Sequence, residues 1–194
     1  MIKLKTLDSI NLRRSIRKFE DKPVPGELIE KLLALTVKAP SGKNIQPWRF
    51  VVIEGPKKQD LVNLLRKGAK TLQQQGINVG SCEWTAESME QAPVIIMIYN
   101  GEGQPGDDRN GINRYQWSVN IQSIGGAIQT LLLAATALGL GTLWICDVFF
   151  AEEQISELLG RGDEMVAAVA VGYPAQSPEA RPRKDWREVT SWVK

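Results

Sequence analysis

The chain has 194 residues, of which 43% are hydrophobic and 24% charged, and its formal net charge is +2; these values exclude a disordered, collagen-like or coiled-coil protein. It contains no histidine, which excludes Ser-His-Asp triads, Cys-His dyads and His-ligated metal sites, so difficult chemistry would have to come from a cofactor. Its two cysteines, Cys82 and Cys146, lie 64 residues apart. This spacing excludes a disulfide framework and a CxxC metal pair, so we expect no metal and a reducing, cytoplasmic compartment.

Positive and negative charges are unevenly distributed along the chain. Residues 1–70 contain 16 Lys and Arg against 7 Asp and Glu, residues 71–170 contain 3 against 12, and residues 171–194 contain 5 against 3. The small net charge and the acidic centre argue against a nucleic acid as partner. A small phosphorylated ligand needs only a local basic cluster, which the two chain ends could supply.

In the first half of the chain, apolar periodicity and turn residues predict three helices and one strand. The first ten residues contain no apolar run of signal-peptide length. The segment at 68–90 is polar and weakly patterned, and is expected to form a lid or a flexible helical excursion. The other expected elements are a helix ending near residue 13, an extended segment at 15–19, a helix at 27–38, a loop at 40–47, a strand at 48–53 and a helix at 57–66.

The second half predicts further strands around one long apolar helix. The run at 119–146 is uncharged and long enough to span a bilayer, but its polar residues and the break at Gly139 and Gly141 favour a buried core or dimer helix. Since no clean βαβ rhythm appears, we expect an α+β fold. The expected elements are a strand at 94–99, a loop at 100–110, a helix at 116–138, a strand at 142–146, a helix at 152–159, a strand at 166–171 and an extended, proline-containing tail at 173–194.

The sequence RRSIRKF occupies residues 13–19. In an extended backbone Arg13, Ser15, Arg17 and Phe19 share one face. Two guanidinium groups and a hydroxyl on that face suit a phosphate and an adjacent electron-rich ring. A solvated basic stretch between two helices would explain the same residues.

Two other segments combine small and polar residues. In PSGKNIQPW, at 40–48, small residues let a ligand approach the backbone while hydroxyl and amide groups offer hydrogen bonds; an ordinary turn-rich loop is the alternative. In LGLGTLWIC, at 138–146, a backbone N–H between helix and strand could point at a bound ring, although a simple Schellman stop explains the glycines equally well. No Rossmann or P-loop glycine motif occurs. Because no cation or helix N-terminus is evident beside Cys146, we expect this residue to be a buried small hydrophobe.

Together, RRSIRKF, APSGKNIQPW, LLLAATALGLGTLWI and VGYP before a basic tail resemble the FMN-dependent nitroreductase family in order and spacing, from Asp8 to about Val189. The resemblance implies a central, mostly antiparallel sheet flanked by helices, in an intertwined homodimer with a swapped C-terminal arm. It implies a single domain over residues 1–194, with 174–194 as the arm, and FMN held at two sites between the protomers.

The resemblance also implies which residues bind the flavin. Those nearest its phosphate and N1/O2 edge would be Arg13, Arg14, Ser15 and Arg17, with the phosphate site completed by Arg181 and Arg183. The other protomer would contribute Pro40, Ser41, Gly42 and Asn44, and the backbone facing N5 would belong to Ile145 and Cys146. The family's Asn and Lys before the strand at 94–99 are replaced here by Thr85 and Ser88 alone.

The implied activity is hydride transfer from NADH or NADPH to FMN and then to a nitroaromatic, quinone or related small-molecule acceptor, by a ping-pong mechanism. No side chain would be a catalytic acid or base, and Arg17 would stabilise the reduced flavin electrostatically. Two alternatives remain open. One is another flavin reaction, of the reductive dehalogenase or flavin-destructase type; the other is a non-catalytic flavin- or nucleic-acid-binding protein.

Overall fold

The computed structural model describes residues 6–103 and 111–194, so part of the loop expected at 100–110 lies outside the described residues. The α-helices are α1 (Thr6–Leu12), α2 (Gly26–Thr36), α3 (Pro56–Gln74), α4 (Cys82–Gln91), α5 (Ile112–Ala137) and α6 (Glu152–Leu159). The strands are β1 (Trp48–Ile53), β2 (Val94–Asn100), β3 (Gly141–Ile145) and β4 (Glu164–Gly172). Short 3₁₀ helices are η1 (Gly42–Asn44), η2 (Asp147–Ala151) and η3 (Trp186–Val189).

The four strands form one sheet in the order β1-β2-β4-β3, and every neighbouring pair is antiparallel. The predicted α+β fold with an antiparallel sheet flanked by helices is therefore confirmed. β2 is buried along its whole length, which explains its uninterrupted apolar sequence.

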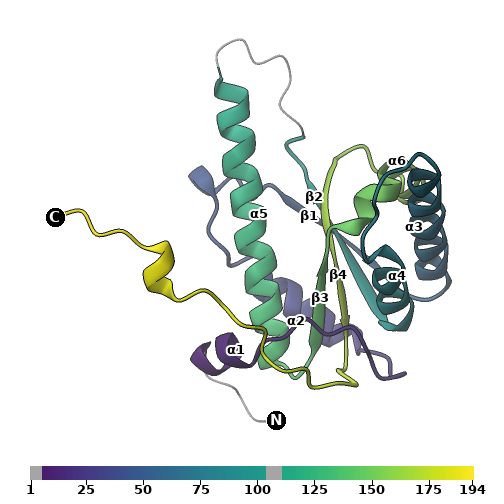
Figure 1. Cartoon of the computed structure of the whole chain (residues 1–194), viewed down its shortest axis with the longest axis horizontal. Helices are drawn as coiled ribbons and strands as arrows, with labels where there is room; N and C mark the ends of the chain where they lie inside the picture. Colours follow the sequence, from purple (N-terminus) through teal and green to yellow (C-terminus); the bar gives the residue numbers. More distant parts are fainter. Residues whose placement is uncertain (1–5, 104–110) are drawn as a thin grey trace.

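Both faces of the sheet are covered by helices (Figure 1). Because side chains alternate along a strand, Ile95 and Met97 of β2 join one core cluster and Ile96 and Ile98 join the other. The first cluster includes residues of α3, α4 and α6, and the second includes residues of α2 and α5. The sheet thus separates two cores, and each face of β2 contributes to one of them.

The N-terminal extended segment lies beside the edge strand β3. The Ile16 backbone N–H donates to the Thr142 carbonyl at 2.9 Å, and a Cβ on Gly141 would lie 2.9 Å from the Ile16 side chain. The start of the C-terminal tail pairs with the same segment, since the Ala175 N–H donates to the Lys18 carbonyl at 3.0 Å. These contacts place the N-terminal extended segment beside both β3 and the start of the C-terminal tail.

The segment expected at 68–90 as a lid or flexible excursion is largely two packed helices. The predicted helix at 57–66 continues to Gln74, because Gly68 allows α3 to contact the Phe150 carbonyl directly and Ala69 is buried behind it. In α4, Cys82, Ala86 and Met89 are buried at helical spacing,. The sequence interpretation missed this pattern because polar residues surround it.

The long apolar helix is α5, and the buried apolar residues of its C-terminal half, from Ile124 to Ala135, belong to the second core cluster. None of the helices in the described part of the chain is both long and apolar enough to cross a membrane. The C-terminal tail extends beyond α5 and away from the sheet (Figure 1), and every residue from Ala180 to Lys194 is exposed.

Candidate functional site

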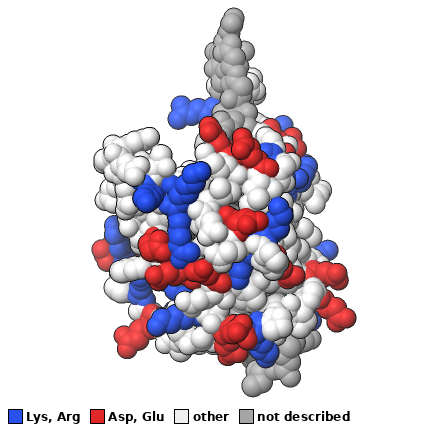
Figure 2. Space-filling model, turned by 90° about the vertical axis from the view of Figure 1, so that its right-hand side faces the viewer, with Lys and Arg blue, Asp and Glu red and all other residues white. Residues whose placement is uncertain are grey.

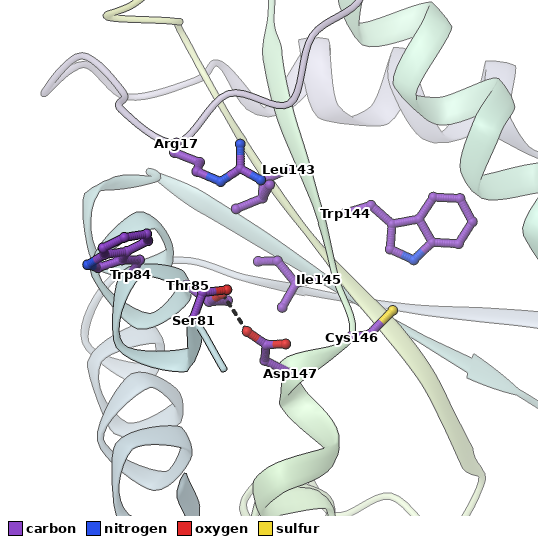
Figure 3. Close-up of a pocket in the computed structure, with 9 residues that line it drawn as sticks. All are labelled: Arg17, Ser81, Trp84, Thr85, Leu143, Trp144, Ile145, Cys146 and Asp147. Atoms are coloured by element: carbon purple, nitrogen blue, oxygen red, sulfur yellow. Dashed lines mark hydrogen bonds between the residues drawn. The ribbon is translucent and has the colours of Figure 1, made fainter. Parts of the chain in front are cut away.

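The end of β3 forms the floor of a cavity between the sheet and α4. Alternation along the strand turns Leu143 and Ile145 toward α4, whereas Trp144 and Cys146 point the other way (Figure 3),. The cavity has a volume of about 260 Å³. Its other walls are Arg17 from the N-terminal segment, Asp147 at the start of η2, and Ser81, Trp84 and Thr85 at the N-terminal end of α4. We call it the β3 cavity.

A hydrogen bond connects two walls of the β3 cavity. The Thr85 hydroxyl donates to a carboxylate oxygen of Asp147 at 2.5 Å, as the dashed line in Figure 3 shows. A hydrogen bond from a hydroxyl to a carboxylate is of the charge-assisted kind. It holds α4 against the β3–η2 junction and fixes the orientation of the carboxylate.

A second hollow, of about 710 Å³, lies between the N-terminal segment and the C-terminal tail. We call it the arginine recess. Its lining includes every basic residue that the resemblance assigned to the flavin phosphate, together with Ser15 and the unexpected Gln129 of α5; these basic residues are Arg13, Arg14, Arg17, Arg181 and Arg183. Residues more than 160 positions apart in the sequence are therefore brought together in one chain.

The charges of these arginines are not neutralised within the described residues. Arg14 donates to the carbonyls of Asn11 and Arg13, and Arg183 donates to those of Arg181 and Pro182. No ion pair joins any of the five arginines to a described acid, and Glu179 is the one acidic residue in the recess lining. Such a concentration of guanidinium groups favours a bound anion, above all a phosphate.

The loop at 40–47 lies at a different place in the fold. The Gly42 backbone N–H donates to the Ser123 hydroxyl of α5 at 3.2 Å, and neither Pro40, Ser41 nor Asn44 lines the recess or the β3 cavity. Within a single chain, the flavin-binding residues predicted in this loop therefore lie apart from those predicted in the arginine recess and at the end of β3. Three non-glycine residues of the loop, Lys43, Asn44 and Gln46, have positive φ angles, a conformation that costs about 1–3 kcal/mol each and is concentrated at functional sites.

The expectation that Cys146 is buried is wrong, because this thiol is exposed in the chain. Cys146 follows the last residue of β3 and points away from the sheet interior (Figure 3). Partial desolvation and the neighbouring Asp147 carboxylate both raise the pKa of the Cys146 thiol. A thiol with a raised pKa is a weak nucleophile at neutral pH, so we expect Cys146 to be unreactive although its side chain is exposed.

Sequence reasoning passed over three residues that line the β3 cavity: Ser81, Trp84 and Asp147. Asp147 carried a usable signal, because it is an acidic residue directly after a buried strand, where side chains often reach a site. Trp84 carried none, since one aromatic residue in a polar segment indicates no particular location. No group of three or more possible metal ligands occurs in the described ranges 6–103 and 111–194.

Arg17 lines both the arginine recess and the β3 cavity, so the two hollows meet at this residue. A ligand that carries a phosphate at one end and a flat ring at the other fits this layout. The phosphate would occupy the recess, and the ring would lie along Leu143 and Ile145 with one edge beside Arg17. The residues present therefore suit a flavin mononucleotide.

Comparisons with known proteins agree with this geometry. Residues 10–173 match the model of the nitroreductase family. A protein of Archaeoglobus fulgidus, provisionally named NADH dehydrogenase/NAD(P)H nitroreductase, is 30% identical over 87% of this chain and 84% of its own length. Iodotyrosine deiodinase of Nematostella vectensis is 30% identical over 88% of this chain and 67% of its own length.

A solved structure from Desulfovibrio desulfuricans, provisionally described as a nitroreductase in complex with FMN, superposes with a TM-score of 0.76. It is 27% identical, and the match covers 100% of this chain and 99% of that one.

Proposed function

Because the chain belongs to the nitroreductase family, we propose that it is an FMN-dependent oxidoreductase that takes hydride from NADH or NADPH and reduces nitroaromatic, quinone or related acceptors. The observation that carries the proposal is the position of Arg17, where a recess rich in arginine meets a cavity lined by β3. When bound, FMN supplies the two-electron chemistry between the nicotinamide and the acceptor.

Within this proposal, the arginine recess binds the phosphate. Arg13 and Arg14 are half-buried beside Ser15, whereas Arg181 and Arg183 are exposed on the tail. The half-buried pair provides a fixed part of the site, and Arg181 and Arg183 complete it from the start of the tail. Ile145 and Cys146 present their backbone to the ring edge at the end of β3.

Arg17 contributes electrostatically. Its guanidinium stands at the mouth of the β3 cavity, above Leu143 (Figure 3), where its fixed positive charge stabilises the negative charge that the ring edge gains on reduction. Fixed charges aimed at developing charge are usually the largest single contribution to catalysis. We propose that solvent supplies the protons that an acceptor needs, which is compatible with the absence of histidine. A single shared cavity then makes donor and acceptor bind in turn.

We further propose a homodimer in which the partner supplies the loop at 40–47 and receives the tail. In support, the tail exposes Trp186, Val189 and Trp192, with exposed fractions of 54%, 66% and 76%. The small residues Gly125 and Gly126 of α5 have open space beside them. A single domain over residues 1–194 with 174–194 as its arm, and a cytoplasmic location, belong to the same proposal. Sedimentation of a flavin-loaded monomer would contradict the dimer.

A second candidate is a reductive dehalogenation on the same flavin. Two observations favour it: the deiodinase similarity, and the ordered helix α4 that places Trp84 and Thr85 at the β3 cavity. Release of iodide or bromide from a halophenol under anaerobic conditions with reductant, at a rate above that of nitroarene reduction, would favour this reaction.

Nucleic-acid binding has little support from the face of the molecule that carries α3, α4 and α6. Figure 2 shows the face covered by α3, α4 and α6, where lysine and arginine lie among aspartate and glutamate. Arg66, for example, is paired with Glu83 and Glu90 at 2.9 and 3.0 Å. Mixed charge of this kind does not give this face the extended basic surface that a phosphate backbone requires.

The proposed function is tested by an absorbance spectrum of the purified protein with FMN, followed by anaerobic addition of NADH and then NADPH. We expect a bound flavin spectrum that bleaches on addition of one or both nicotinamides and returns on addition of an acceptor. A protein that stays colourless with FMN present would refute the proposal.

A further inference from the structure

The β3 cavity contains one acidic side chain that the proposed chemistry leaves without a role. Asp147 is half-buried at the cavity wall, and its carboxylate is held by the Thr85 hydroxyl at 2.5 Å. No described lysine or arginine forms an ion pair with it. A negative charge therefore faces the cavity in a fixed orientation.

Arg17 is the cavity's one positive side chain, and in the proposed function it serves the flavin edge. Once Arg17 is paired in this way, Asp147 is the uncompensated charge in the cavity lining. Two unit charges a few ångströms apart near a protein surface interact strongly enough to decide between ligands of opposite charge.

The lip of the cavity suits an aromatic ring. Trp84 stands on the first turn of α4 at the cavity mouth (Figure 3), with 70% of its surface exposed. A second hollow, lined by Gly80, Ser81, Glu83 and Trp84, adjoins it on the solvent side. An exposed indole at the mouth of the cavity provides a flat surface for stacking.

We propose, on the basis of the proposed function, that the electron acceptor of this protein is a planar aromatic or quinoid molecule that carries a cationic amine. The ring stacks at Trp84 and the amine lies at the Asp147 carboxylate. Thr85 is a positioning residue that acts through Asp147. An acceptor that carries a carboxylate is disfavoured by the same charge.

Asp147 also holds α4 against η2, and this structural role has to be separated from charge selection. Asp147→Asn removes the charge but keeps an oxygen that accepts the Thr85 hydrogen bond. Thr85→Val removes the hydrogen bond and keeps the charge. Glu157→Gln, at an exposed position on α6 outside the cavity, is the matched control for loss of one negative charge.

The first experiment measures binding without turnover. Oxidised, FMN-loaded protein is titrated by calorimetry with benzylamine, benzyl alcohol and benzoate at neutral pH. We expect the wild type to bind benzylamine most tightly and benzoate least. In Asp147→Asn the ratio of the benzylamine to benzoate association constants should fall about tenfold, equivalent to ~1.4 kcal/mol. Glu157→Gln should leave this ratio unchanged. Thr85→Val should lower the ratio by a smaller factor than Asp147→Asn does.

The second experiment measures kcat/KM for 4-nitrobenzylamine and 4-nitrobenzoate in the same proteins. Comparing the kcat/KM ratio of the two substrates in wild type with the same ratio in Asp147→Asn cancels the difference in intrinsic reactivity between the substrates. The fold-change in this ratio should match the fold-change in the ratio of association constants. An unchanged ratio in Asp147→Asn with FMN still bound would overturn this inference and leave the proposed function standing. Failure of wild-type protein to bind FMN, or of NADH and NADPH to reduce it, would instead refute the proposed function.

Discussion

Removing an arginine from the arginine recess should weaken FMN binding only through the loss of contacts to the phosphate of FMN. We consider Arg13→Ala and Arg183→Ala, because these residues approach the recess from opposite ends of the chain. A hydrogen bond to a charged group contributes about 1.5–3 kcal/mol, which corresponds to roughly 10-fold to 150-fold in Kd. Arg13 is half-buried and Arg183 exposed, so we expect a loss near 100-fold for Arg13 and about tenfold for Arg183.

The assay is quenching of flavin fluorescence on titration of apoprotein, carried out with FMN and in parallel with riboflavin. Riboflavin has the same ring and ribityl chain but no phosphate. Both variants should therefore lose affinity for FMN and retain the wild-type affinity for riboflavin. Arg187→Ala is the control, since Arg187 lies on the same tail but pairs with Asp185 at 3.1 Å and does not line the recess.

Two results would refute the reasoning. Unchanged FMN affinity in both variants would mean that the phosphate lies elsewhere. Equal losses for FMN and riboflavin would mean that the substitutions disturb the fold of the N-terminal segment or the tail rather than a phosphate contact.

Three further predictions concern stability and the cysteines. Gly68→Ala should lower the free energy of unfolding by about 1–3 kcal/mol in urea denaturation, because the Cβ of the alanine would overlap the Phe150 carbonyl. Gly26→Ala is the control. No atom lies near that position, so the free energy of unfolding should change by less than ~0.5 kcal/mol. Burial raises the pKa of Cys82 from 9.0 to about 11. The contribution of the protonated thiol to stability is therefore complete below pH 9 and is lost as the pH rises toward 11. Urea midpoints measured across this pH range should fall in the wild type and fall less in Cys82→Ala. Cys146→Ser and Cys82→Ser should keep anaerobic flavin reduction by nicotinamide within about tenfold of wild type, and Arg17→Ala should slow it more; loss of reduction in either serine variant with FMN bound would reveal thiol chemistry.

Much of the architecture follows from local sequence patterns. The strand at 48–53 was predicted with the bounds that β1 has, and the helix at 152–159 with those of α6, because turn residues flank a short apolar or amphipathic run in each case. The α+β class followed from the order of these elements. The motif RRSIRKF contains three of the five arginines of the recess, Arg13, Arg14 and Arg17, and this cluster of guanidinium groups is visible in the sequence itself.

Other features depend on contacts between distant residues, which no local pattern encodes. The polar segment at 68–90 is ordered because Ala69, Cys82 and Met89 are buried against the first core cluster. Cys146 was expected to be a buried small hydrophobe because no cation or helix N-terminus is evident beside it, yet the position after Ile145 turns its side chain outward. The pattern of polar and apolar residues in a segment does not show which of its side chains another helix or strand will bury.

By itself, the sequence determined the chemical groups available: no imidazole, two unpaired thiols, and arginines at both chain ends. The tertiary structure alone decided which of these groups meet. Backbone pairing of residues 18–20 with 173–175 brings Arg181 and Arg183 to the recess that holds Arg13, and packing of α4 brings Thr85 to Asp147, 62 positions away. The physical reason is that contacts between distant residues depend on sheet pairing and core packing over the whole chain. The free energy of these interactions cannot be assigned to any single segment.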